Sequence, residues 1–359
     1  MQAIIEQFRQ AILAAGATGA SLRLRGGGSK DWYGGAPAGQ VLDTRAYAGI
    51  VAYEPTELVI TARCGTPLTE IEAALAERHQ MLAFEPPHFG PGATVGGMVA
   101  CALSGPRRAS AGAVRDFVLG AGLMDGRGQA LRFGGQVMKN VAGYDVSRLL
   151  AGSLGTLGLI LEASLKVLPL PPREISLCFA LGEIEALRLL NQWAGQPLPV
   201  SASCWHDGEL TLRLSGARAA VESARRTLGG EELADGAPFW HALREQHHTF
   251  FADGASIWRL SVPSNASAII LRGRQLIEWG GAQRWLRVDG AGEGGDEGAA
   301  LAGAIRRSAA AAGGHATLFR GGDKRLGVFH PMAPALAAVQ RRLQQSFDPE
   351  GIFNPGRMY

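Results

Sequence analysis

Glycine is the residue that most constrains what this chain can fold into. It occupies 50 of the 359 positions, about twice its average share of roughly 7%. Many of these glycines stand inside apolar segments rather than in low-complexity runs. Because glycine has no β-carbon, it permits positive φ angles and lets a backbone approach a ligand closely. We therefore expect a fold in which main-chain atoms contact a bound molecule.

The remaining composition is typical of a folded protein. The chain is 47% hydrophobic and 19% charged, so it can build substantial cores and a disordered chain is excluded. At about 100–200 residues per domain, its length allows two or three domains. A net charge of +3 without a basic arm gives nucleic-acid binding no electrostatic support.

Targeting signals and cysteine clusters are missing from the sequence. No apolar run approaches the roughly 18 residues of a membrane span, and residues 1–6 lack the positive start of a signal peptide. Cys64, Cys101, Cys178 and Cys204 lie far apart and form no Cys-x-x-Cys pair. We therefore expect a cytoplasmic protein without its own iron–sulfur or Cys-rich zinc site.

The first 170 residues predict strands and helices separated by glycine-rich turns. Helices are expected over 2–14, ending near Gly16, over about 69–79 with Thr69 as cap, and at 146–150. Strands are expected at 21–25, 57–64 and 157–167, with a hairpin of 117–123 and 130–133 around Asp125-Gly126. Residues 84–116 show almost no periodicity, and a loop of this length in a compact domain is usually functional.

A proline cluster at 169–172 marks the best domain boundary. Beyond it, strands and helices alternate, which favours an α+β domain. The strands are expected at 175–180, 209–214, 256–262 and 284–288, and the helices at 183–194, 217–227 and 297–312. An amphipathic helix is expected at 332–346, before the segment 347–356.

Three glycine-rich motifs are candidates for binding. The first, Arg25-Gly26-Gly27-Gly28-Ser29-Lys30, follows a predicted strand. Successive glycines let main-chain N–H groups turn toward an anion, and Ser29 and Lys30 add a hydroxyl and a charge. The motif therefore predicts phosphate binding, with a flexible turn as the alternative.

The second and third motifs suit an extended ligand. Residues 91–100 continue into 104–107 and 111–112 with small side chains throughout, so a backbone can lie along a ligand there. An ordinary Ω-loop is the alternative. In the third motif, residues 139–145 precede Gly152, Gly155 and Gly158, which could equally serve tight packing of a turn on a sheet.

A fourth glycine-rich segment, 290–295, matches the pattern G-x-G-x-x-G of dinucleotide-binding proteins. Glu293, Asp296 and Glu297 would face a pyrophosphate with like charge, and no acidic residue follows about 20 positions later to hold a ribose. We therefore interpret it as a surface loop.

The ordered set of motifs resembles one family. Segments 25–30, 93–97, 104–107, 114–120, 139–145, 152–160 and 347–356 together look like the FAD-binding domain of the vanillyl-alcohol oxidase / p-cresol methylhydroxylase superfamily. Within it, the chain most resembles the FAD-binding subunits of bacterial glycolate oxidases. The resemblance implies an α+β fold with an FAD-binding domain at 1–171, an inserted α+β cap at 172–320, and a C-terminal segment, 321–359, that returns to the FAD domain.

The resemblance also implies which residues bind FAD. The pyrophosphate would be held by Arg25, Gly26, Gly27, Gly28, Ser29 and Lys30. The ribityl chain and isoalloxazine would lie along Ala93, Thr94, Val95, Gly96, Gly97, Ser104 and Gly105. Other residues near the cofactor would be Ala111, Gly112, Gly155, Gly158, Ile160 and Asn354.

Departures from the family pattern bear on chemistry. Members with histidine-linked flavin carry a histidine beside the first loop, where this chain has Ser29-Lys30, so we expect non-covalent FAD. His88 is the nearest alternative. Among His241, His247 and His248, the six-residue gap from His241 to His248 resembles the metal-binding histidine pair of related dehydrogenases, but the Gly-Asp-Gly-Asn-x-His partner of that pair is missing. Since a metal needs converging ligands, we expect no metal and place His247 and His248 on a helix surface.

Three functions follow from these departures. In the first, the chain is the FAD-binding subunit of a multi-subunit glycolate (2-hydroxy acid) oxidase, working with a larger FAD-containing subunit and an iron–sulfur subunit. In the second, it is a self-sufficient 2-hydroxy-acid dehydrogenase, with Arg259, Arg320, Lys324 and His315 as candidates to hold the carboxylate or take the hydroxyl proton. In the third, it is a non-catalytic scaffold. We expect the first, with membrane association only through partners and with catalytic residues unassigned.

Overall fold

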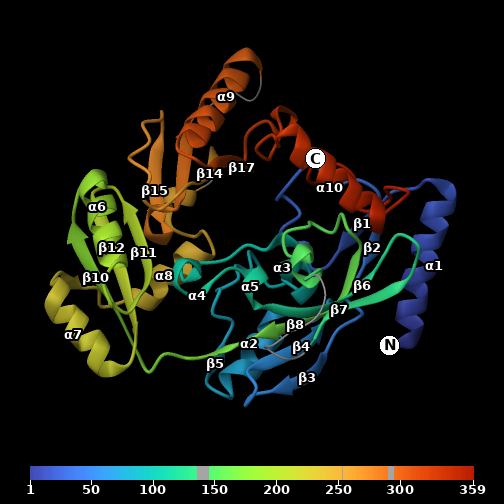
Figure 1. Cartoon of the computed structure of the whole chain (residues 1–359), viewed down its shortest axis with the longest axis horizontal. Helices are drawn as coiled ribbons and strands as arrows, with labels where there is room; N and C mark the ends of the chain where they lie inside the picture. Colours follow the sequence, from blue (N-terminus) through green and yellow to red (C-terminus); the bar gives the residue numbers. More distant parts are fainter. Residues whose placement is uncertain (136–144, 253, 290–294) are drawn as a thin grey trace. The chain divides into compact units, whose positions relative to one another are not determined.

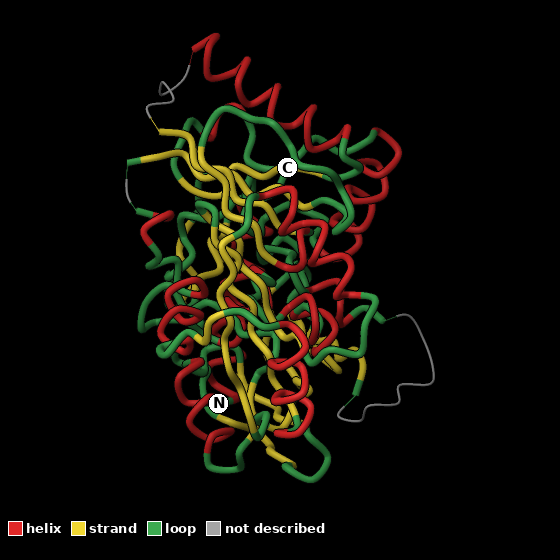
Figure 2. The backbone as a smooth tube through the Cα atoms, turned by 90° about the vertical axis from the view of Figure 1, so that its left-hand side faces the viewer, coloured by secondary structure: helices red, strands yellow, loops and turns green. Residues whose placement is uncertain are grey.

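The structure is a computed structural model that describes residues 1–135, 145–252, 254–289 and 295–359. The chain divides into two compact units. Unit 1 contains residues 1–103, 112–169 and 331–359, and unit 2 contains residues 104–111 and 170–330. Within each unit helices pack against strands (Figures 1 and 2), so the predicted α+β class is confirmed.

Unit 1 is built on an antiparallel five-stranded sheet in the order β3-β4-β8-β6-β7. Its strands are β3 (Ile50–Glu54), β4 (Val59–Arg63), β6 (Val118–Met124), β7 (Ala130–Gly134) and β8 (Leu159–Lys166). The apolar run in β8 is mostly buried because this strand is central. Strands β6 and β7 form the predicted hairpin, with Met124 opposite Ala130.

Two small strand pairs complete unit 1. Strand β1 (Leu22–Arg25) lies parallel to β2 (Gln40–Asp43), and β5 (Gln80–Met81) pairs with β9 (Leu168–Pro169). Leu22 also pairs with Phe353 from the end of the chain. Its N–H donates to the carbonyl of Ile352 at 2.7 Å, and its carbonyl accepts from the N–H of Asn354 at 2.8 Å. The C-terminal segment thereby extends the strand that leads into the first glycine-rich loop.

The described helices of unit 1 are α1 (Gln2–Thr18), α2 (Leu68–Ala76), α3 (Val95–Cys101), α5 (Val114–Phe117), η1 (Ser147–Leu150) and α10 (Pro334–Phe347). Helix α1 continues past Gly16 to Thr18 and is capped by Gly19, whose φ of 66° is the left-handed conformation of a helix cap. Helix α2 is preceded by Pro67, so the prediction of Thr69 as its cap was wrong.

The sequence showed almost no periodicity over residues 84–116, but this stretch is not a structureless loop. It contains helix α3, whose Val95, Met98 and Val99 are buried. These three positions have helical spacing, but Gly96 and Gly97 between Val95 and Met98 concealed the pattern. The short helix gives the second glycine-rich motif a rigid support.

Unit 2 contains an eight-stranded sheet in the order β13-β10-β12-β11-β15-β16-β14-β17. The strands are β10 (Arg173–Ala180), β11 (Val200–His206), β12 (Glu209–Gly216), β13 (Glu231–Glu232), β14 (Ala255–Ser261), β15 (Arg274–Glu278), β16 (Gln283–Asp289) and β17 (His315–Arg320). The described helices are α4 (Arg108–Ala111), α6 (Glu183–Ala194), α7 (Arg218–Leu228), α8 (Gly236–Arg244), η2 (Thr249–Phe251), η3 (Trp279–Gly281), α9 (Gly295–Ala311) and η4 (Lys324–Leu326).

Two apolar clusters stabilise this sheet. Residues Leu177, Leu210, Leu212 and Leu214 of β10 and β12 pack with buried residues of α6 and α7. A second cluster joins β14, β16 and β17 to α9. The sequence predicted β10, β12, β14 and β16 and the three long helices, but it missed β11, β15, β17 and α8. Strand β15, Arg-Gln-Leu-Ile-Glu, has no alternation of period two, whereas β11 begins with a regular Val-Ser-Ala-Ser-Cys alternation that the sequence reading overlooked.

The compact units differ from the predicted boundaries at two places. Residues 321–330 stay with unit 2, because the N–H of Leu318 donates to the carbonyl of Val328 at 2.8 Å and Arg306 donates to Leu326. Residues 104–111 also belong to unit 2. There Arg107 pairs with Glu174 at 2.6 Å, and the indole N–H of Trp279 donates to the carbonyl of Gly105 at 3.1 Å.

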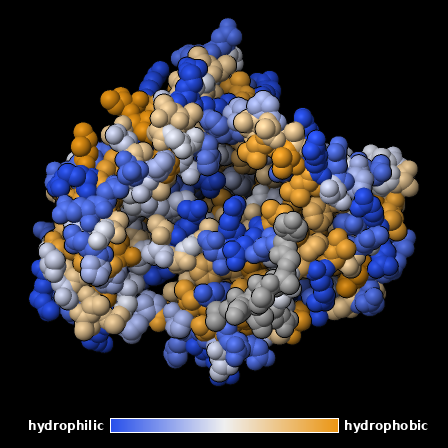
Figure 3. All heavy atoms as spheres, viewed as in Figure 1, coloured by the Kyte–Doolittle hydropathy of each residue, from blue (hydrophilic) through white to orange (hydrophobic). Residues whose placement is uncertain are grey.

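Among the described residues, no helix is both long and apolar enough to cross a membrane. The face shown in Figure 3 mixes hydrophilic and hydrophobic side chains. The motif at 139–145 lies outside the described residues apart from Asp145, and the loop at 290–295 lies outside them apart from Gly295.

Candidate functional site

Unit 1 contains a cleft where segments distant in sequence converge. The lining comes from the loop after β1, from helix α3, from the turn before β8 and from the C-terminal segment. The cleft is partly open, and its empty space of about 820 Å³ includes solvent at the mouth.

The first and second glycine-rich motifs cross each other at this cleft. A β-carbon at Gly27 would lie 1.4 Å from the carbonyl oxygen of Gly92, and one at Gly26 would lie 2.3 Å from Oγ1 of Thr94. Only glycine allows the two backbones to approach this closely. The predicted convergence of the two loops is therefore present in the structure.

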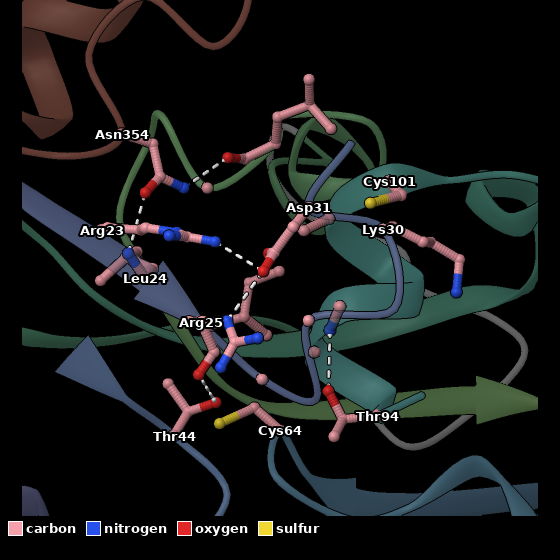
Figure 4. A pocket seen from close by; sticks show the side chains of 18 of the residues that line it. Arg23, Leu24, Arg25, Lys30, Asp31, Thr44, Cys64, Thr94, Cys101 and Asn354 are labelled. Carbon is pink, nitrogen blue, oxygen red and sulfur yellow. Dashed lines mark hydrogen bonds and ion pairs between the residues drawn. The ribbon is translucent and has the colours of Figure 1, made fainter. Parts of the chain in front are cut away.

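Positive charge dominates the lining of the cleft. Its charged members are Arg23, Arg25, Lys30 and Arg357 against the single carboxylate of Asp31, a formal excess of three positive charges. Arg23 and Arg25 alternate along β1 and so share one face of the strand. Figure 4 shows both guanidinium groups directed at Asp31, with Nε of Arg25 at 2.8 Å from its carboxylate. The excess charge fits an anionic group such as a pyrophosphate.

Lys30 is held at the edge of the same loop. Its side chain is buried, and Nζ donates to the carbonyl of His88 at 3.2 Å and lies 5.6 Å from the ring centroid of Phe89. His88 itself contacts Glu72, with Nε2 at 3.1 Å from the carboxylate. His88 does not line the cleft.

Helix α3 forms one wall of the cleft. Thr94 precedes the helix, and its Oγ1 accepts from the N–H of Gly97 at 3.3 Å. A β-carbon at Gly96 would lie 2.7 Å from that of Cys64, so the helix rests directly on the end of β4. Burial raises the pKa of the Cys64 thiol to about 12 and also raises the pKa of Cys101. Both cysteines in the lining are therefore uncharged thiols at neutral pH.

The turn before β8 both packs tightly and lines the cleft. At Gly155, where φ is 73°, a β-carbon would lie 2.5 Å from the amide nitrogen of Asn354. At Gly158 it would lie 2.7 Å from the carbonyl of Met124. The two interpretations of this motif, packing and ligand contact, are therefore compatible.

The C-terminal segment reaches the cleft through Asn354. Its Oδ1 accepts from the N–H of Leu24 at 2.8 Å, and its Nδ2 donates to the carbonyl of Leu154 at 2.6 Å. Asn354 is buried and has φ of 43°, which asparagine tolerates better than most residues. One side chain thus connects β1 with the turn before β8.

The structure brings together most of the residues that the sequence had singled out. Those that line the cleft are Arg25, Gly26, Gly27, Gly28, Ser29, Lys30, Thr94, Gly96, Gly97, Gly155, Gly158, Ile160 and Asn354. Those outside the lining are Ala93, Val95, Ser104, Gly105, Ala111 and Gly112. Ala93 and Val95 are buried in the core, while Ser104, Gly105 and Ala111 belong to unit 2.

Several lining residues were missed by sequence reasoning, chiefly Arg23, Asp31, Thr44, Cys64 and Arg357. Arg23 could have been found, because it alternates with Arg25 on a predicted strand that leads into the loop. Arg357 gave no such signal, since it is 327 positions from Lys30, whose carbonyl it contacts.

Among the described residues, the histidines of unit 2 belong to no converging group of three or more metal-ligating side chains. The prediction that His247 and His248 lie on a helix was wrong, because α8 ends at Arg244. His248 instead precedes η2, where its Nδ1 accepts from the N–H of Phe250.

The candidate substrate residues of unit 2 already have contacts within that unit. Arg320 donates to Oε1 of Gln246 at 2.7 Å, and the guanidinium of Arg259 lies 5.5 Å from the ring centroid of Phe319. Burial, together with Arg259 and His330, lowers the pKa of His315. Nothing in this group marks a prepared carboxylate site.

Comparison with known proteins agrees with the geometry of the cleft. The family model "FAD binding domain" matches residues 4–134. The chain is 50% identical over 358 residues to the glycolate oxidase subunit GlcE of Escherichia coli (strain K12), covering 100% of this chain and 97% of that protein.

More distant relatives share only part of the chain. A D-lactate dehydrogenase of Anaerostipes hadrus is 35% identical over 136 residues, which is 38% of this chain and 28% of the relative. The glycolate oxidase subunit GlcD of Bacillus subtilis (strain 168) is 39% identical over 93 residues, 26% of this chain and 20% of the relative.

A solved structure of an alkyldihydroxyacetonephosphate synthase shares the fold, with a TM-score of 0.65 at 14% identity over 98% of this chain and 74% of that one. The fold, the FAD-binding family model and the identity along the whole chain all agree. The chain therefore belongs to the family of the glycolate oxidase subunit GlcE.

Proposed function

We propose that this chain is the FAD-binding subunit of a multi-subunit glycolate (2-hydroxy acid) oxidase and that it binds FAD non-covalently in the cleft of unit 1. In this proposal unit 1 is the FAD-binding domain, unit 2 is the inserted cap, and the electrons leave through an iron–sulfur partner. The proposed location is the cytoplasm, with any membrane association through partners.

The observation that carries the proposal is the convergence of Gly26, Gly27 and Gly28 with four cationic side chains in one cleft. Main-chain N–H groups freed by these glycines, together with Arg25 and Lys30, suit the two negative charges of a pyrophosphate. The small residues of α3 and of the turn before β8 that line the cleft let the flat remainder of the cofactor lie close to the backbone.

Two observations support a non-covalent site. The histidine nearest the first loop, His88, contacts Glu72 and does not line the cleft. The lining thiols Cys64 and Cys101 are protonated at neutral pH, because burial raises their pKa values, and a protonated thiol is a weak nucleophile.

The subunit role is supported by two of the relatives, GlcE of Escherichia coli and GlcD of Bacillus subtilis, which are themselves glycolate oxidase subunits. Bound FAD would supply a two-electron acceptor for a 2-hydroxy acid. In this chain, the residues of the cleft would bind and orient that acceptor. An electron route through a partner also agrees with the cysteines of this chain. The four are far apart in sequence and form no Cys-x-x-Cys pair, the spacing typical of iron–sulfur ligands.

The test is the visible spectrum of the purified chain, alone and with the other subunits of its complex. We expect yellow protein whose flavin is fully released by acid precipitation. Glycolate should leave that spectrum unchanged in the isolated chain and bleach it in the assembled complex. Colourless protein would favour the scaffold, bleaching of the isolated chain would favour a self-sufficient dehydrogenase, and flavin retained in the precipitate would overturn the non-covalent site.

A further inference from the structure

The loop that carries the first glycine-rich motif is held at both ends by a single turn of the C-terminal segment. The turn comprises residues 354–357, and the N–H of Arg357 donates to the carbonyl of Asn354 at 3.2 Å across it. Asn354 accepts from the N–H of Leu24, directly before the loop. Arg357 contacts the chain directly after it.

The guanidinium of Arg357 donates hydrogen bonds to several main-chain carbonyls. Its Nη1 donates to the carbonyl of Gly35 at 2.7 Å and to that of Asp31 at 2.9 Å, and its Nη2 lies 3.5 Å from the carbonyl of Lys30. Arg357 is buried, with 8% of its surface exposed. A guanidinium has several N–H donors fixed in one plane, so it holds several carbonyls in a defined arrangement. The ammonium group of a lysine cannot make the same set of hydrogen bonds.

Main-chain contacts also bring residues 34–35 close to residues 356–357. The N–H of Gly35 donates to the carbonyl of Arg357 at 2.9 Å. A β-carbon at Gly35 would lie 2.0 Å from the carbonyl of Gly356, and one at Gly34 would lie 2.8 Å from that of Arg357. The two segments therefore approach each other backbone to backbone, and the side chain of Arg357 crosses that contact.

We propose that Arg357 is a positioning residue for FAD, which fixes the phosphate-binding loop by holding the carbonyls of Lys30, Asp31 and Gly35. Each of these carbonyls carries partial negative charge beside the cationic cleft. Because these carbonyl oxygens accept hydrogen bonds from the guanidinium, they repel a bound anion less. The side chain of Arg357 also adds a positive charge to the lining. The inference rests on the proposed FAD site and extends it to a residue outside the glycine-rich motifs.

The test is chemical rescue of FAD binding. Arg357→Ala should weaken FAD binding at least tenfold, which corresponds to about 1.4 kcal/mol, as measured by titrating apoprotein with FAD and following flavin fluorescence. Millimolar guanidinium chloride should restore a large part of the affinity, because the ion can occupy the vacated site and bind the same carbonyls. Urea at the same concentration is the matched control, since it has a similar shape and no charge.

Arg357→Lys separates geometry from charge and replaces Arg357→Ala if that variant does not fold. It keeps the positive charge, so the salt dependence of FAD binding should stay the same while the affinity falls by about tenfold, or 1.4 kcal/mol. Arg45→Lys is the control, because Arg45 is exposed and pairs with Asp43 outside the cleft. Its affinity for FAD should be unchanged.

Each outcome decides between the two proposals. Wild-type apoprotein that does not bind FAD overturns the proposed function and this inference with it. Wild-type protein that binds FAD, combined with Arg357 variants of equal affinity, overturns the positioning role alone. Rescue by urea as effective as rescue by guanidinium would show that Arg357 merely fills space, which also contradicts the inference.

Discussion

Asn354 and Leu24 are joined by a hydrogen bond of 2.8 Å across 330 positions of sequence. The side chain of Asn354 accepts from the strand that leads into the phosphate-binding loop and donates to the turn before β8. Two of the segments that line the cleft therefore depend on one amide group in the C-terminal segment.

Replacement of Asn354 by aspartate tests this connection. The variant keeps the shape and the acceptor toward Leu24 but loses the donor to the carbonyl of Leu154. An unsatisfied buried carbonyl costs about 1–3 kcal/mol, and we expect urea unfolding of the full chain to show a loss of that size. Asn191→Asp is the control, since Asn191 also donates to carbonyls but is more exposed. An equal loss in both variants would contradict a special role for Asn354.

Gly27→Ala should abolish retention of FAD during purification. A single methyl group at this position collides with the carbonyl of Gly92, so the crossing of the first two loops has to open. Gly16→Ala is the matched control, because Gly16 lies inside α1 and a β-carbon there would be at an ordinary contact distance of 3.9 Å from Cγ of Glu350. That control should keep FAD and gain up to about 1 kcal/mol of stability. Full flavin content in Gly27→Ala would disprove the close crossing.

Lys30→Met should weaken FAD binding by about tenfold, or 1.4 kcal/mol, and should make it less sensitive to salt. The variant keeps an apolar stem beside Phe89 and removes one of the four positive charges in the lining. Titrations at two ionic strengths measure both effects. Arg45→Met, outside the cleft, should change neither the affinity nor its salt dependence, and an unaltered salt dependence in Lys30→Met would refute the electrostatic role.

Unit 2 should lose stability as the pH falls below about 6.5. Burial lowers the pKa values of His206, His248, His315 and His330, so the unfolded chain binds more protons than the folded chain in this range. Stability from these groups is therefore present above their unfolded pKa of roughly 6.5 and is lost as pH falls through the lower folded values. Thermal melting at pH 7.5 and 5.5 measures the difference.

His206→Phe provides the control for that pH effect. The variant keeps a ring beside Phe250, which His206 contacts edge-on, but removes one titrating group. The drop in melting temperature between pH 7.5 and 5.5 should become smaller. A drop of the same size as in the wild type would exclude His206 as a contributor.

Much of the fold could be predicted from local sequence patterns. The hairpin of β6 and β7, the central strand β8 and helices α6 and α7 have clear periodicity and turn signals, and all are present. Helix α3 was missed because its apolar positions stand among glycines, where propensity argues against a helix and tertiary burial decides.

The candidate site was predictable where it is made of backbone, and less so where it is made of side chains. The glycines of the first two motifs indicated a close approach of main chain, and they line the cleft. Arg357 was not predicted, because its function depends on carbonyls of residues 30–35 that only tertiary structure brings to it. Segment 104–111 was placed in the first domain, but contacts such as Arg107 to Glu174 hold it in unit 2.

The pairing of Leu22 with Phe353 also sets an order for folding during synthesis. Residues 170–330 leave the ribosome before residues 331–359, so most of unit 2 is available while β1 still lacks its neighbour. The nascent first unit must therefore wait, with one edge of β1 unpaired, until residues 331–359 emerge. This long-range closure makes completion of the cleft a late event in the folding of unit 1.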